Sequence, residues 1–341
     1  MKKSSLITIA ILLALSSIAI YFYKSKGGSS TIDKEASSFP VKDTAAVDKI
    51  FLADKDGRSV LLERTKEGWI LNKKYHVRPD AITLLLYTMR MVEVQSPVSK
   101  TGKKNILKIM AARSTKIEIY SKGEKIKQYY VGHTTQDHLG TYMLLTNLET
   151  NENYEEPFIT HIPGFDGFLT TRYNTYELDW RDRIVMNYSP PHIKQIKLEL
   201  HEMPDSSFVL DLFSMQRFGL KTDKGAQLLF DEGKLKQYIA YFQNINCEVV
   251  LEKSDPLLDS LSKSAIPFAT LTVIDRENKA SVCEFFHKLP IANKNEEYGV
   301  NYKYDPDKLF IRYNDNKDYG VAQYYVFGKI LQTYGYFLNR K

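Results

Sequence analysis

One short stretch, VGHTTQDHLGTYMLL at residues 131–145, places a carboxylate between two imidazoles. His133 and His138 could bind a metal ion, and the Asp137 carboxylate between them could add a ligand or move protons. A zinc site would need a third ligand, for which Asp137 and His161 are the candidates. Because their spacing does not place the two histidines on one face of a helix, only a loop could bring them together.

The same stretch has the pattern of two strands joined by a loop. Apolar and polar residues alternate on both sides of it, while Gly132 and Gly140 are residues that favour loops. We therefore predict a structural loop here, with no catalytic, cofactor-binding or metal-binding residue. The alternative is a cell-envelope hydrolase or metal-dependent enzyme built on His133, Asp137 and His138.

Common catalytic signatures are absent from the sequence. No G-x-S-x-G, G-x-x-x-x-G-K or G-x-G-x-x-G motif is present, and the Met-Pro-Asp that follows His201 and Glu202 excludes the H-E-x-x-H zinc helix. The chain has two cysteines, Cys247 in a predicted helix and Cys283 in a predicted strand. A single disulfide and two buried free thiols both remain open.

A second group of functional side chains lies in the connector between the halves of the chain, in the sequence WRDR. Tryptophan and arginine are favoured where proteins bind one another, so Trp180, Arg181 and Arg183 are candidates for binding a protein partner. In the structural alternative, Trp180 fills a groove between the halves and the arginines pair with Asp179 and Asp182. The C-terminal segment is rich in tyrosine and phenylalanine, which predicts a core or half-buried sheet, with a glycan-binding module as a further alternative.

Two similar successions of predicted elements would position these side chains. In the first half, short strands precede a helix at 78–100 and the strand IEIY; in the second half, short strands precede a helix at 231–253 and the strand LTVI. Trp69 corresponds to Phe218, and the order of elements repeats at a period of about 150 residues. This order predicts a tandem duplication, with another helix expected at 155–169 near the end of the first copy.

The turns between the predicted strands are short, so the strands of each half should be antiparallel, with a helix covering one face. The predicted fold class is α+β: an N-terminal transmembrane helix followed by two tandem, structurally similar modules, each an antiparallel β-sheet packed with helices. The predicted parts of the chain are a transmembrane anchor at 1–26, a flexible tether at 27–46, a first module at 47–176, a connector at 177–191 and a second module at 192–341.

The predicted anchor rests on residues 6–23, an uncharged apolar run that ends in three aromatic residues followed by lysines. As a helix it would extend about 27 Å, close to the thickness of a bilayer core. Aromatic residues followed by positive charge are typical of a membrane interface. We therefore predict an uncleaved, single-pass anchor in the cytoplasmic (inner) membrane with the bulk of the chain facing the periplasm, and a cleaved signal peptide as the alternative.

The formal charge of +6 is concentrated around this run, where Lys2, Lys3, Lys24 and Lys26 lie without any acid. The remainder of the chain is nearly neutral. Because nucleic-acid binding depends on a basic surface, we predict that nucleic acid is not a partner.

Several segments of the chain form one recognisable set: the N-terminal anchor and tether, then VDKIFLADKDGRSVLLERTKEGWILN, RPDAITLLL, IEIY and YYVG, and finally DWRDRIVMNYSPPHIKQIKLEL. In these segments the chain resembles the bacterial "domain of unknown function" 4340 proteins. It spans most of residues 46–250, and its most distinctive residues are Trp69 and the Asp179, Trp180, Arg181 triplet. The family implies a membrane-bound extracytoplasmic protein, some relatives of which lie beside gliding-type ABC transporter components. It implies no reaction, cofactor or catalytic residue.

The predicted function is that of a non-catalytic, membrane-anchored extracytoplasmic scaffold or accessory subunit. It would reach the membrane through its N-terminal helix and act through contacts with a protein partner in the envelope. A transport or gliding-type ABC transporter assembly is the hypothesis for that partner, and no cofactor is expected.

Overall fold

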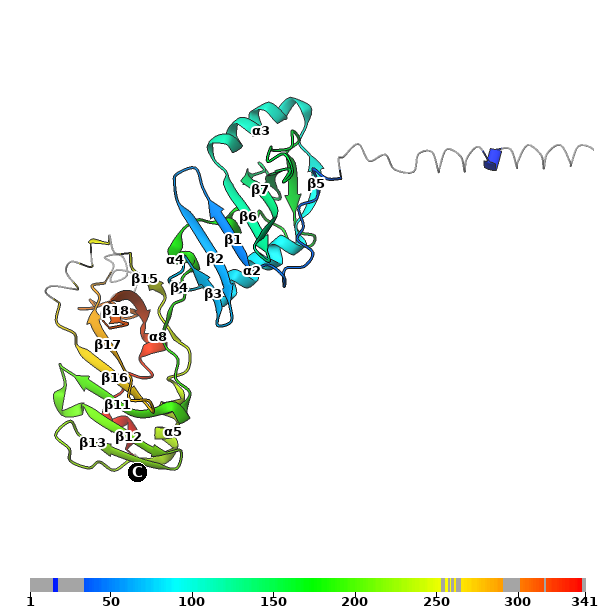
Figure 1. Ribbon diagram of the computed structural model, residues 1–341. Helices are drawn as coiled ribbons and strands as arrows, with labels where there is room; N and C mark the ends of the chain where they lie inside the picture. Colours follow the sequence, from blue (N-terminus) through cyan, green and yellow to red (C-terminus); the bar gives the residue numbers. More distant parts are fainter. Residues whose placement is uncertain are drawn as a thin grey trace, which may run out of the picture. The chain divides into compact units, whose positions relative to one another are not determined.

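The computed structural model describes residues 34–252, 265–290, 301–315 and 317–338, and also 15–17, 255, 256, 258 and 261. The chain divides into two units, which we name unit 1 (Met1–Trp180) and unit 2 (Arg181–Lys341). Each unit is built around one large antiparallel sheet (Figure 1).

Unit 1 contains a nine-stranded sheet with the strand order β4-β3-β2-β1-β6-β7-β8-β9-β5. Its strands are β1 (Lys49–Ala53), β2 (Ser59–Thr65), β3 (Gly68–Leu71), β4 (Tyr75–His76), β5 (Glu93–Pro97), β6 (Thr115–Ser121), β7 (Glu124–Thr134), β8 (Thr141–Leu145) and β9 (Phe158–His161). Its helical segments within the described residues from 34 onward are α2 (Pro79–Met91), α3 (Lys100–Ala112), the 3-10 turn η1 (Thr170–Tyr173) and α4 (Glu177–Trp180). In the central strand β1, Ile50 lies opposite Leu62 on one side and Ile119 on the other, so that apolar side chains align across the sheet.

Alternation along the strands gives unit 1 two apolar layers. On β7, Tyr129 and Val131 point into the main core together with the buried side of α2, whereas Tyr130 lies on the opposite face. On that second face, α3 packs through Ile106 and Met110. The sheet is therefore covered on both faces around β7.

Unit 2 contains an eight-stranded sheet with the order β13-β12-β11-β16-β17-β18-β19-β15, and a two-stranded sheet of β10 and β14. Its strands are β10 (Ile184–Met186), β11 (Ile193–Leu200), β12 (Phe208–Ser214), β13 (Arg217–Lys221), β14 (Ile245–Asn246), β15 (Val249–Val250), β16 (Ala269–Asp275), β17 (Ala280–His287), β18 (Lys308–Tyr313) and β19 (Asp318–Gln323). Its described helical segments are η2 (Pro190–His192), η3 (Pro204–Ser206), α5 (Glu232–Ala240), α8 (Tyr324–Phe327) and η4 (Tyr334–Phe337). Edge-to-face contacts among Phe208, Tyr238 and Phe337 join β12, α5 and η4.

The two sheets share one connectivity. In unit 1, β3, β2 and β1 lie in order beside β6, and in unit 2, β13, β12 and β11 lie in order beside β16. β7, β8 and β9 then follow in unit 1 as β17, β18 and β19 do in unit 2, and the last strands are β5 and β15. Trp69 lies in β3 and Phe218 in the equivalent β13. This common order is what a tandem duplication would leave.

The predicted α+β class with an N-terminal transmembrane helix is wrong, because the described chain is mainly β. The segment expected to be a helix at 78–100 is a shorter helix followed by a strand: α2 ends at Met91, Val92 is extended with a ψ of 130°, and β5 follows, while α3 begins only at Lys100. Pro97 ends β5, and the residue before a proline disfavours helical backbone. In unit 2 the expected helix is also shorter, since α5 ends at Ala240.

Two further expectations about local structure are wrong. The segment 155–169 is not helical but contains β9, and the loop after it includes Gly164 and Gly167 at φ values of 76° and 152°, which favour glycine. Cys247 lies between β14 and β15 and not in a helix. Both Cys247 and Cys283 are buried free thiols.

The expected transmembrane anchor receives no support from the structure. Residues 6–23 lie outside the described residues, except for 15–17. Among the residues that the structure describes, no helix is both long enough and apolar enough to cross a bilayer. The prediction of a single-pass protein of the cytoplasmic (inner) membrane, with its bulk facing the periplasm, is therefore withdrawn.

Candidate functional site

The loop between β7 and β8 holds Asp137 in a compact turn. The Thr135 amide donates to the Gly140 carbonyl over 2.9 Å, and the Gly140 amide donates to the Thr135 hydroxyl oxygen over 2.9 Å. The Asp137 carboxylate accepts hydrogen bonds from the Thr135 hydroxyl at 2.5 Å and from the Leu139 amide at 3.1 Å. These bonds hold the pKa of the Asp137 carboxyl below its ordinary value. Asp137 therefore closes the turn.

The two histidines of this hairpin have different surroundings. The His133 ring packs on Tyr142 with the centroids 4.8 Å apart, and burial lowers the pKa of His133. Its Nδ1 is buried and has no hydrogen-bond partner in the described part of the chain. His138 is exposed at a φ of 60°, and its ring centroid lies 6.0 Å from that of Phe168.

His161, the other candidate for a third ligand, lies in β9 opposite Glu93 of β5. Within the described ranges, no three His, Cys, Asp or Glu side chains form a group that could hold a metal ion. What the hairpin provides is a rigid turn and one partly buried imidazole, His133, whose neutral form is favoured.

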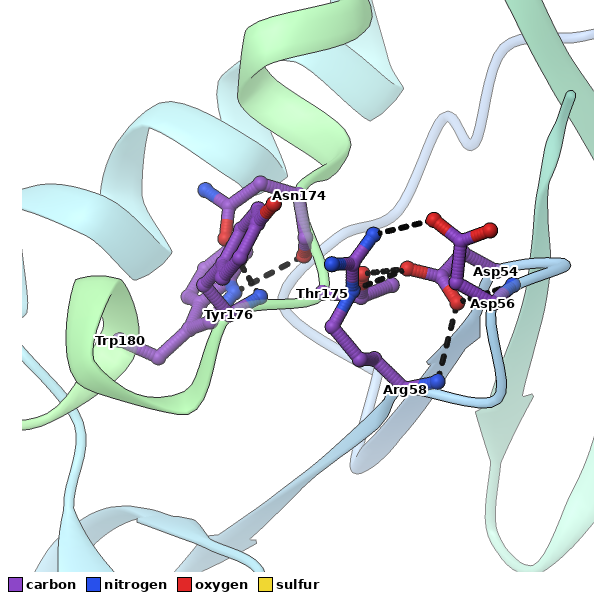
Figure 2. A network of polar contacts seen from close by, with 7 residues as sticks. All are labelled: Asp54, Asp56, Arg58, Asn174, Thr175, Tyr176 and Trp180. Atoms are coloured by element: carbon purple, nitrogen blue, oxygen red, sulfur yellow. Dashed lines mark hydrogen bonds and ion pairs between the residues drawn. The ribbon is translucent and has the colours of Figure 1, made fainter. Parts of the chain in front are cut away.

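Trp180 belongs to the core of unit 1, where it is 2% exposed. Its indole Nε1 donates to the Asn174 carbonyl over 3.0 Å, as Figure 2 shows. The Arg78 amide, which precedes α2, donates to the Trp180 carbonyl over 2.8 Å. The indole bond therefore closes the terminal segment of unit 1 on itself, and the Trp180 carbonyl joins that segment to the residue before α2.

A polar network ties the same segment to the turn between β1 and β2 (Figure 2). The Thr175 hydroxyl donates to the Asp54 carboxylate over 2.5 Å, and Arg58 Nε donates to it over 2.8 Å. Burial raises the pKa of Asp54, but the hydrogen bonds from Thr175 and Arg58 outweigh this effect, so the pKa lies below its ordinary value. The Arg58 guanidinium also lies 4.5 Å from the centroid of the Tyr176 ring. The network fixes the segment that carries Trp180.

Arg181 and Arg183 are both engaged within unit 2. Arg181 is 9% exposed, and its Nη2 lies 2.6 Å from Oδ2 of Asp318. Arg183 Nη1 donates to the carbonyl of Glu248 over 2.7 Å. Both acceptors are distant in sequence from the connector. The expected pairing of the arginines with the neighbouring Asp179 and Asp182 is therefore not what these two contacts show. Trp180 and Arg181 are thus buried on either side of the boundary between the units.

A histidine in unit 2 forms a cluster that the sequence analysis missed. The His287 ring stacks between Tyr304 and Phe268, with centroid distances of 3.7 and 4.3 Å. Its Nε2 lies 3.1 Å from the carboxylate of Glu202, a residue 85 positions away in sequence. No local motif signals a contact over such a separation. The arrangement holds the imidazole in place from three sides.

The C-terminal aromatic residues of unit 2 are mostly half-buried, and two of them belong to its core. Phe327 and Phe337 are fully buried, whereas Tyr325 is exposed. Phe327 and Phe337 therefore lie in the core, as was expected for aromatic residues of this segment.

A second feature that the sequence analysis missed is a group of exposed apolar side chains on unit 1. Leu84 and Tyr87 of α2 are 44% and 50% exposed, and Phe165, after β9, is 37% exposed. Arg172 of η1 lies among them, because its Nη1 donates to the Thr88 hydroxyl over 3.0 Å and its guanidinium lies 4.2 Å from the centroid of the Phe165 ring. We name Leu84, Tyr87, Phe165 and Arg172 the aromatic–arginine patch.

The sequence contained a signal for this patch. Ile82, Leu85, Leu86, Met89 and Val92 repeat at helical spacing in the sequence and form one apolar stripe. Leu84 and Tyr87 are apolar positions outside that stripe, three residues apart and hence on one side of the helix. Phe165 and Arg172 could not be added from sequence, because they come from a different part of the chain.

No protein family model matches the chain, and no curated protein or solved structure matches it either. The resemblance to the domain-of-unknown-function family therefore remains a prediction.

Proposed function

We propose that the chain is a non-catalytic scaffold or accessory subunit that acts through protein contacts and binds its partner with the aromatic–arginine patch of unit 1. The observation that carries the proposal is the exposure of Leu84, Tyr87 and Phe165 around Arg172. Tyrosine and arginine are among the residues that contribute most to binding energy at protein interfaces, and surrounding apolar groups exclude water from them. A partner surface with an apolar centre and a carboxylate opposite Arg172 fits this composition.

The patch is ordered before a partner arrives. Thr88 is buried in α2 and fixes the Arg172 guanidinium, over which the Phe165 ring lies. A Cβ on Gly167 would come within 2.9 Å of the Phe165 ring, so glycine at this position leaves room for the ring. Side chains that are already held in place lose less conformational entropy on binding, which favours affinity.

The proposal also includes membership of the domain-of-unknown-function 4340 family, on the residues that carry the resemblance. Some relatives in that family lie beside gliding-type ABC transporter components. A transport assembly is therefore the first place to look for the partner.

Site-directed photo-crosslinking in the producing cells tests the proposal. A photoreactive phenylalanine in place of Tyr87 should capture one reproducible protein, and Leu84→Asp should abolish the capture because it places a charge in the apolar patch. Leu148→Asp is the matched control, since Leu148 is an exposed leucine of unit 1 outside the patch. The captured protein should also bind the purified full chain. Its affinity should be lower for the Leu84→Asp variant and unchanged for the Leu148→Asp variant. Equal capture by both variants would refute the role of the patch.

The enzyme alternative is separable by a different substitution. The double variant His133→Ala, His138→Ala should leave partner capture and cellular phenotype unchanged if the β7–β8 loop is structural. Zinc that co-purifies with the wild-type chain and is lost, together with function, in the double variant would favour the metal-dependent enzyme instead.

A further inference from the structure

Unit 1 contains a pocket of about 350 Å³ between α3, the sheet and the loop that follows β8. Its floor includes Met110 of α3, Tyr130 of β7 and Leu144 of β8. Its rim includes Lys55, from the turn between β1 and β2, and Glu155, from the loop before β9. The volume lies at the lower end of the roughly 300–1,000 Å³ range of ligand pockets, so a small molecule suits it.

The two rim charges have opposite sign. Lys55 Nζ lies 5.6 Å from the centroid of the Tyr130 ring, which is a weak cation–π arrangement. Across the part of the chain that the structure describes, neither Lys55 nor Glu155 takes part in an ion pair. An acidic and a basic group therefore both border an apolar pocket and are available to a ligand.

The floor of the pocket is formed by close packing of α3 on β7. A Cβ on Gly132 would lie 2.9 Å from Cγ of Met110 and 3.1 Å from the Tyr142 carbonyl oxygen, so only glycine lets the helix come this near. Met110 and Leu144 are buried in one small apolar cluster with Ile106 and Val98. The pocket is thus preformed on regular elements and not on a loop alone.

We propose that this pocket binds a small zwitterion with an aromatic side chain, of the class of the free aromatic α-amino acids. The ligand ring packs against Tyr130, Tyr154 and Leu107, which line the pocket. Its carboxylate pairs with Lys55 and its ammonium group with Glu155. An internal peptide segment has no terminal charges and an uncharged apolar ligand has none at all, so the charge pair favours the free amino acid over both.

The chain should hold one such site. In unit 2 the equivalent positions on β17 and β18 carry Phe286 and Phe310, which are buried together with Leu261. Phe310 is bulkier than Leu144, the pocket residue on the equivalent strand β8, whereas Phe286 takes the place of Tyr130 on the equivalent strand β7. The expected stoichiometry is therefore one ligand per chain.

Calorimetric titration of the full chain with L-tryptophan tests the proposal, with tyrosine ring shifts in NMR spectra as a second readout. Saturable binding at one ligand per chain is expected. Lys55→Ala and Glu155→Ala should each weaken it by about 10-fold, the effect of losing one charge-assisted hydrogen bond. Ala111→Phe, which places a ring at a position lining the pocket, should abolish binding. Lys104→Ala, an exposed lysine of α3 outside the pocket lining, is the control and should bind as the wild type does.

N-acetyl-L-tryptophan amide carries the same indole without either charge and should bind about 100-fold more weakly, as two such bonds are lost. The proposal is overturned if L-tryptophan, L-phenylalanine and L-tyrosine all fail to bind at millimolar concentration. It is equally overturned if the uncharged amide binds as tightly as the amino acid, or if the three pocket variants bind normally. Circular dichroism of each variant shows that loss of binding is not loss of folding.

Discussion

Replacing Asp318 with asparagine should destabilise unit 2 and leave unit 1 unchanged. The Asp318 carboxylate is buried, 2.6 Å from Arg181 Nη2 and 2.7 Å from the side-chain nitrogen of Asn314. Asparagine keeps the shape but removes the charge opposite a buried guanidinium. Removing one partner of a buried pair costs about 3–5 kcal/mol. Because Asp318 is not the whole of the environment of Arg181, which interacts with other groups as well, we expect unit 2 to lose about 2–3 kcal/mol of its free energy of unfolding.

The same hairpin provides a matched control. Asp315 lies between β18 and β19, and its carboxylate is 3.6 Å from Lys317 Nζ, with both side chains 72% exposed. Exposed ion pairs of this kind often contribute nothing measurable to stability. Asparagine also tolerates the φ of 54° found at this position. Asp315→Asn should therefore unfold at the same denaturant concentration as the wild type.

The two tryptophans allow the two units to be followed separately. Trp69 and Trp180 both belong to unit 1, so tryptophan fluorescence during urea unfolding reports unit 1. Hydrogen exchange of the β18 and β19 amides reports unit 2, which avoids treating a chain of two units as a single two-state transition. Asp318→Asn should accelerate exchange in β18 and β19 without moving the fluorescence transition. The reasoning is refuted if Asp315→Asn and Asp318→Asn accelerate hydrogen exchange in β18 and β19 equally. It is also refuted if Asp318→Asn destabilises unit 1, measured by fluorescence, as much as unit 2.

Three further substitutions test other contacts. Burial raises the pKa of Asp305, but hydrogen bonds from Lys288 and two backbone amides outweigh this effect, so the pKa in the folded chain lies below its ordinary value. The stability of unit 2 should therefore fall as the pH drops below about 4, where the unfolded chain binds more protons. In an acid titration followed by circular dichroism, Asp305→Asn should lose less stability over that range than the wild type. Gly140→Ala should lower the free energy of unfolding of unit 1 by about 1–3 kcal/mol, because the new Cβ would lie 2.5 Å from Cγ2 of Ile159. Thermal unfolding followed by tryptophan fluorescence measures this as a lower unfolding temperature. Burial lowers the pKa of His133, so below about pH 6.5 the unfolded chain binds more protons than the folded chain. Unit 1 should therefore lose stability as the pH falls through this range. His133→Phe should reduce that loss in the same fluorescence assay.

The early strands of each unit could be predicted because their signals are local. The turn DKDG between β1 and β2 places Gly57 at a φ of 85°, and the Asp54 carboxylate accepts the backbone amides of Asp56 and Arg58. α2 begins within one residue of the start of the helix predicted at 78–100, because Pro79 suits the first turn and Asp80 suits the positive end of the helix dipole. Residue type alone sets the backbone at these points.

The later elements could not be predicted because their partners are distant in sequence. β5 is a strand because it pairs with β9, so that Val94 lies opposite Thr160. Neither segment has a strand pattern by itself. β5 falls at the end of the helix predicted at 78–100, and β9 falls within the helix predicted at 155–169. The contacts of the candidate sites have the same character, since Arg181 finds Asp318 and Lys55 meets the pocket through the fold and not through a motif.

The shared connectivity of the two sheets and the differences between their surfaces point to a division of labour. Connectivity depends on turns and alternation, which many sequences satisfy, so it persists while residue identity is lost. Surface features depend on single side chains and diverge quickly. In unit 1, α2 exposes Leu84 and Tyr87, whereas the equivalent helix α5 has no exposed large apolar side chain along Glu232–Ala240. Leu144 lines the pocket in unit 1, whereas the equivalent position in unit 2 carries the bulkier Phe310, which is buried with Phe286. Both proposed binding features thus lie in unit 1, so substitutions on the exposed side of α5 should leave partner capture and amino-acid binding intact.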